Sequence, residues 1–143
     1  MGCDIHVHTE IDLGQGWEHY SVPHVRRNYV LFTHMGMTHR IDDIEPVTPL
    51  RGIPGNVTNI TRADFEGWGE DAHSASWFGL DEIVRLEDLW RDGVIPIYDK
   101  RTPWIESEFG YLFGNGWGDL KRWPDEPGRV KVSDVRWIFW FDN

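Results

Sequence analysis

The sequence predicts an α+β fold: a central mixed or antiparallel sheet containing the N-terminal and C-terminal strands, two or three helices and long ordered loops. Three patterns predict it. Polar and apolar side chains alternate over residues 3–11, residues 136–141 are almost all apolar, and residues 81–90 carry an apolar stripe at helical spacing. A chain of 143 residues suits a single domain, 1–143, that can bury a core.

The first strand is expected to bury one face only. Its apolar side chains, among them Ile5 and Val7, would point to one side of the sheet. Its other face would carry four side chains that titrate or bind metals: Asp4, His6, His8 and Glu10. A Gly-rich turn at 13–16 and a second strand over 17–22 would complete a hairpin.

Three helices are expected after the hairpin. Residues 26–37 form the first, which ends near a glycine. Thr61 would cap a short second helix through Gly67, with Asp64 as the acid of its first turn. The third covers 81–90, where the apolar stripe is clearest.

The end of the chain predicts a central strand. Residues 130–143 read as strand, and within them 136–141 are apolar on both faces except at Arg136, as expected for a strand covered on both sides. Residues 41–61 are rich in Pro and Gly and predict a long ordered loop. Residues 94–128 show little period and allow no placement of elements.

Composition limits the partners. The net charge of −10 argues against binding to long nucleic acids and to anionic membranes, which both require basic surfaces. It leaves room for a small anionic ligand in a local pocket. The single cysteine allows no internal disulfide, and no stretch reaches the ~18 apolar residues of a membrane span. A cytoplasmic protein is therefore expected.

The start Met-Gly-Cys raises lipidation as an alternative reading. The myristoylation pattern requires Ser or Thr at the sixth position, where this chain has His6. Asp4 follows Cys3 directly, and no basic cluster supports an anchor. The sequence therefore favours a site on the first strand over a lipid anchor.

The polar face of the first strand admits two chemistries. His6 and His8 could chelate a divalent metal, with Asp4 or Glu10 as a further ligand. Alternatively His6 could transfer protons without metal, oriented by Asp4 or Glu10. The competing structural interpretation is a solvated strand face. The pattern requires no cofactor, and it is compatible both with a bound divalent metal and with metal-free chemistry.

A second cluster occupies residues 71–77. Asp71 and His73 could form another carboxylate–imidazole pair, while Ser74 and Ser76 offer hydroxyls and Trp77 a flat face for a base or sugar. The alternative is a turn in which Asp71 is a cap and His73 bonds to the backbone.

Arg51, in the turn at 51–54, is a third candidate. Its guanidinium could bind a phosphate at two points, or form a structural ion pair with one of the many carboxylates. Asp142 would reach the site if the last strand pairs with the first.

Residues 4–9, Asp-Ile-His-Val-His-Thr, resemble the first motif of the PHP family of metal-dependent phosphoesterases. The resemblance implies that His6 and His8 bind metal in a phosphate-hydrolysing site. That family continues with Ser-Asp-Gly, whereas this chain continues with residues 10–12, Glu-Ile-Asp.

The wider pattern resembles a family of small bacteriophage proteins that begin Met-Gly-Cys-Asp-Ile-His. The shared features are an early acid, an Arg-Gly-Leu/Ile-Pro turn, an Asp-x-His-Ser-x-Ser-Trp stretch before a helix and an end similar to Phe-Trp-Phe-Asp. They match residues 1–6, Glu10, 51–54, 71–77 and 139–142, and His8 is not fixed in the pattern. The resemblance implies a phage setting, where small proteins often counter host defence.

These observations together predict an enzyme that cleaves a phosphodiester-type bond in a small nucleotide, such as a cyclic immune signal. His6 and His73 would face each other across the bond in one shared hollow, Arg51 and Ser74 would hold phosphate oxygens, and Trp77 would stack a base. A non-catalytic nucleotide sponge and an acidic inhibitor of a host protein are the alternatives. The sequence is compatible with a homo-oligomer and does not fix the oligomeric state.

Overall fold

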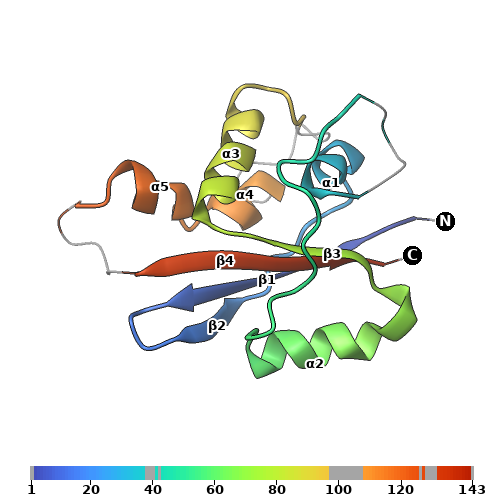
Figure 1. The fold of residues 1–143 in the computed structure, drawn as a ribbon. Coiled ribbons are helices and arrows are strands. Elements are labelled where there is room, and N and C mark those ends of the chain that lie inside the picture. The colour runs from blue at the N-terminus through green and yellow to red at the C-terminus, as the bar shows by residue number, and fades with distance from the viewer. Residues whose placement is uncertain are drawn as a thin grey trace.

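The computed structural model describes residues 2–37, 41, 43–96, 108–125, 127 and 132–142. Its centre is a four-stranded antiparallel sheet in the order β2-β1-β4-β3 (Figure 1). The strands are β1 (Ile5–Asp12), β2 (Trp17–Ser21), β3 (His73–Phe78) and β4 (Asp134–Phe141). The prediction that the first and last segments share one sheet is confirmed, because β1 pairs with β4 along eight residues.

Helices cover both faces of this sheet. α1, α3 and α4 lie on one side, and α2 lies across the other (Figure 1). The helices are α1 (Tyr29–Met35), α2 (Asn59–Trp68), the 3-10 turn η1 (Gly69–Asp71), α3 (Leu80–Arg91), α4 (Glu108–Phe113) and α5 (Trp117–Arg122). The α+β class is confirmed, with more helices than the two or three expected. None of the helices in the described part of the chain combines the length and apolar character that crossing a bilayer requires.

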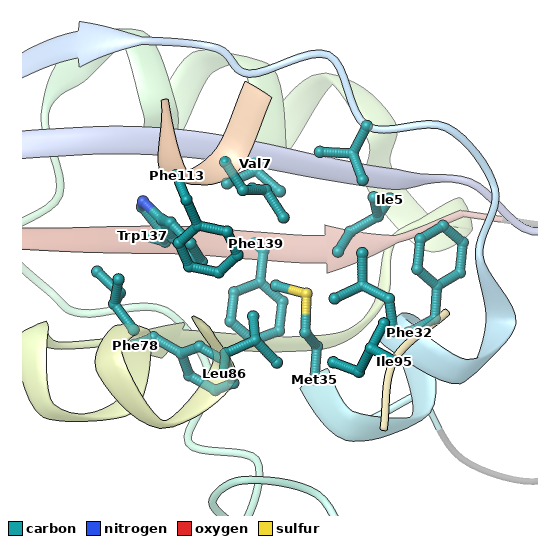
Figure 2. Packing of buried hydrophobic residues seen from close by; sticks show 14 of the residues in the cluster. Ile5, Val7, Phe32, Met35, Phe78, Leu86, Ile95, Phe113, Trp137 and Phe139 are labelled. Atoms are coloured by element: carbon teal, nitrogen blue, oxygen red, sulfur yellow. The ribbon is translucent and has the colours of Figure 1, made fainter. Parts of the chain in front are cut away.

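The apolar core fills the space between the sheet and α1, α3 and α4. Alternation along β1 turns Ile5 and Val7 to this side, where they meet Phe139 and Phe141 of β4. Figure 2 shows Ile5, Val7 and Phe139 packing against α1 and α3, with the fully buried Leu86 among them. Burial of this hydrocarbon is the main stabilising contribution to the fold.

The opposite face of β4 is also covered, so the prediction of a central strand is confirmed. Ile138 and Trp140 are fully buried on this side. Phe65 of α2 packs edge-on against Trp140, with 5.1 Å between ring centroids. Positions 130, 131 and 143 of the expected strand lie outside the described residues.

Two helix predictions change in detail. α1 begins after Asn28, whose side chain accepts from the Leu31 amide, and ends at Gly36 in the left-handed conformation (φ 118°). α2 begins at Asn59 rather than after Thr61, so the cap prediction was wrong. Thr61 lies inside the first turn of the helix. Its buried hydroxyl does not cap the helix but donates to the Glu10 carboxylate of β1.

Two regions that show no clear periodicity in the sequence form regular secondary structure. Part of the cluster at 71–77, for which a turn was the alternative interpretation, is the edge strand β3, with a bulge between His73 and Ser76 that hides its alternation. Within 94–128 the structure contains α4 and α5, while 97–107, 126 and 128 lie outside the described residues.

Candidate functional site

Three candidate segments meet at one end of the sheet. The chain enters β1 there, leaves β4 there and enters β3 there (Figure 1). Phe141 pairs with Ile5 on one side and with His73 on the other. The two motifs, far apart in sequence, are therefore neighbours of the same strand end.

His6 and Asp142 form the closest pair at this end. The Nε2 atom of His6 lies 2.6 Å from Oδ2 of Asp142. The backbone amide of Asp4 donates to the other carboxylate oxygen at 3.3 Å, and the Asp142 amide donates to the Asp4 carbonyl at 3.0 Å. The expectation that Asp142 reaches the first strand through strand pairing is confirmed.

The imidazole of His6 is partly open to solvent. Its side chain is 24 % exposed, and among the described residues none hydrogen-bonds its Nδ1 atom. Trp68, the last residue of α2, lies beside the ring at 4.3 Å between centroids, and Trp140 stacks near it at 5.9 Å. Trp68 was not among the predicted residues, since a tryptophan at a helix end carries no sequence signal for a site.

Asp4 does not orient His6. Its carboxylate forms a two-point ion pair with Arg27, at 2.6 Å to Nε and 3.1 Å to Nη2. This hydrogen bonding holds the pKa of Asp4 below its usual value. Asp142, rather than Asp4, is therefore the carboxylate in contact with His6, and Asp4 instead holds an exposed cation near the site.

Glu10 is a structural carboxylate rather than a partner of His6. Its side chain is fully buried and lies 2.9 Å from Arg136 Nε. Its other oxygen accepts hydrogen bonds from the Thr58 amide and from the hydroxyls of Thr58 and Thr61. Burial alone would raise the pKa of Glu10, but these hydrogen bonds together outweigh it and lower the pKa. Arg136 breaking an apolar strand is the sequence signal that points to such a buried pair.

His8 is a link between α2 and the hairpin. It is 2 % exposed, with Nε2 at 2.7 Å from Asp64 of α2 and Nδ1 at 2.9 Å from His19 of β2. Burial lowers the pKa of His19, and the neighbouring His8 lowers it further. His8 thus packs α2 onto the sheet.

The predicted metal group of His6, His8 and Asp4 is not assembled. Each of the three side chains is bonded to a different partner. In the part of the chain that the structure describes, no three His, Cys, Asp or Glu side chains are arranged to hold a metal ion.

His73 lies at the same sheet end as His6 but against the other face. Its ring stacks on Phe141, at 6.2 Å, whereas His6 lies against Trp140, which points the opposite way. The expected shared hollow between the two imidazoles is therefore not formed. His73 Nδ1 is instead 3.1 Å from Ser74 Oγ. Asp71, in η1, makes no hydrogen bond to His73.

Arg51 forms the structural ion pair that was its alternative interpretation. Its guanidinium lies 2.8 Å from Glu82 and 3.7 Å above the Trp77 ring, and it also donates to the Trp77 carbonyl. Its backbone amide donates to the buried hydroxyl of Ser76. In this arrangement Arg51 occupies one side of the Trp77 ring and is paired with Glu82, so the base-stacking role of Trp77 and the phosphate role of Arg51 stay predictions.

Comparison with known proteins adds no relative: no protein-family model, curated protein or solved structure matches the chain. The chemistry must be read from the geometry. What the sheet end offers is a partly exposed imidazole held by a carboxylate, with an indole beside it.

Proposed function

We propose that the protein cleaves a phosphodiester-type bond in a small nucleotide, with His6 as the proton-transfer group and Asp142 as the carboxylate that orients it. The observation that carries the proposal is the 2.6 Å contact between His6 Nε2 and Asp142 Oδ2 on a partly exposed ring.

The pair supports general acid–base chemistry. A carboxylate on Nε2 favours the tautomer that donates there, which leaves the Nδ1 lone pair to accept a proton. In that state His6 removes a proton from an attacking water or ribose hydroxyl. Once protonated, it can return the proton to the leaving oxygen while Asp142 stabilises the imidazolium.

Two neighbours supply the binding groups. The indole of Trp68 beside His6 offers a flat surface on which a nucleobase can stack. Arg27 is half exposed and held by Asp4, whose backbone contacts Asp142. A planar guanidinium in that place can exchange its carboxylate for a phosphate. These residues take the roles first assigned to Trp77 and Arg51.

The resemblance to phage proteins supports the biological setting, an immune signal as substrate, and supports nothing about the reaction itself. Sequestration without cleavage would use the same imidazole, indole and guanidinium. The experiment must therefore separate turnover from tight binding.

The test is incubation with a panel of linear and cyclic nucleotides, with chromatography before and after heat denaturation of the protein. We expect a new product, and a loss of at least about 100-fold in rate for His6→Ala and Asp142→Asn. His24→Ala is the matched control, because His24 is an exposed histidine whose ring contacts Tyr111.

A signal that disappears and returns intact after heating would show a sponge. No depletion of any nucleotide would favour the protein-binding alternative. Unchanged turnover in His6→Ala would remove the proposed mechanism.

A further inference from the structure

Ser74 adopts a backbone conformation that is unusual for its residue type. Its φ is +54°, inside the bulge between His73 and Ser76 of β3. Glycine is the residue that takes a left-handed position in a bulge at least cost, because a Cβ crowds the backbone there. The chain therefore holds a hydroxyl at a position where a glycine would be easier to accommodate, and such outliers gather at functional sites.

The strained residue directs its hydroxyl at a base. Ser74 Oγ lies 3.1 Å from His73 Nδ1, and both residues are partly exposed. A serine within hydrogen-bond reach of an imidazole is the basic arrangement of an activated nucleophile. Ser76, two residues along the same strand, shows the contrast: it is fully buried and its hydroxyl accepts from the Arg51 amide.

The acidic side chains next to the bulge indicate which kind of substrate the serine could attack. The residues just before it in η1, Glu70 and Asp71, are acidic and exposed. The guanidinium of Arg51, which is bonded to the same strand, is engaged by Glu82 and the Trp77 ring. A negative setting disfavours an anionic phosphodiester and favours an uncharged substrate.

We propose that Ser74 is a nucleophile, with His73 as its base, for an uncharged carboxylic ester. The hydroxyl proton moves to His73 Nδ1 as Oγ bonds to the carbonyl carbon. The bond from that carbon to the alkoxy oxygen then breaks, and the leaving alcohol takes the proton from His73. Water hydrolyses the resulting serine ester to a carboxylic acid and restores Ser74.

This centre is independent of the His6–Asp142 pair, because it lies against the other face of the sheet end and needs no nucleotide. The test uses the purified full-length protein with an uncharged fluorophosphonate probe. Serine attack forms an O–P bond and releases fluoride, so the adduct is seen by intact mass and placed by peptide mapping.

We expect one adduct, at Ser74, and hydrolysis of p-nitrophenyl acetate above the buffer rate. Ser74→Gly removes the hydroxyl and relaxes the backbone, so it should fold at least as well as the wild type, as a melting temperature checks, and lose labelling. His73→Ala should slow labelling by about 100-fold, with partial rescue by added imidazole.

The controls are Ser21→Ala, a serine on β2, and His24→Ala, an exposed histidine outside both proposed centres, and both should label like the wild type. The proposal is overturned if Ser74 carries no adduct, or if Ser74→Gly keeps the wild-type esterase rate. Neither result bears on nucleotide cleavage by His6, which is measured with different substrates.

Discussion

The two faces of the sheet are stabilised in different ways. Toward α1, α3 and α4 the strands present hydrocarbon side chains such as Val7 and Phe139. Toward α2 the same strands present His8, Glu10 and Arg136, each buried and each bonded to a partner in another element. One face is held by packing, and the other is held largely by a network of directed polar contacts.

The difference teaches where the molecule tolerates change. A packed hydrocarbon face loses stability in proportion to the volume removed and partly relaxes around the gap. A buried polar network fails differently, because removing one member leaves its partner desolvated and unpaired. It also responds to pH, which the apolar contacts do not.

The largest expected effect is on the polar face. Arg136→Met should lower the free energy of unfolding by about 3–5 kcal/mol, because it leaves the Glu10 carboxylate buried without its cation. Urea denaturation followed by circular dichroism measures the change.

The double variant Arg136→Met with Glu10→Leu sharpens this prediction. It removes both charges, so most of the lost stability should return. If the double variant is as unstable as the single one, the stabilising role lies in the whole hydrogen-bond network rather than in charge pairing.

The matched change on the apolar face is Leu86→Ala. Leu86 is fully buried in α3, and its truncation should cost about 2–5 kcal/mol, depending on how far the surroundings collapse. The same denaturation experiment, repeated between pH 4 and 8, should show a loss that does not vary with pH. A loss that changed with pH would break the contrast between the faces.

The smallest effect is the pH dependence from Glu10, whose pKa lies below the usual value of 4.5. A carboxyl with a lowered folded pKa stabilises the fold above its unfolded value and loses that contribution as pH falls through the folded pKa. The wild type should therefore be more stable than Glu10→Gln at pH 7, with the difference shrinking below about pH 4.5. A difference independent of pH would contradict the lowered pKa.

Much of the fold was predictable because periodicity records which side of an element is buried. Alternation identified β1, continuous apolar character identified β4 as central, and helical spacing identified α3. β3 was missed because its bulge at Ser74 breaks the alternation that marks a strand. α4 and α5 span six residues each, too short for a helical period to stand out.

The candidate site was less predictable, because a sequence shows which residue types are present but not which ones meet. Four of the early candidates are tied to partners that no local pattern names: Asp4, His8, Glu10 and Arg51. The partner of His6 could be anticipated, since it follows from pairing the first strand with the last. The opposed faces of His6 and His73 depend on a register that only the folded sheet fixes.

The backbone contact from Gly52 to the Ala75 carbonyl has a consequence for self-association. It places Gly52 against the outer rim of β3 at Ala75, whereas no other described strand pairs with the outer rim of β2. A fibril that grows by strand addition requires two unpaired sheet edges, here called rims, on every molecule. A strand added at the β3 rim would first have to displace this contact, so that rim is a poor template for fibre growth.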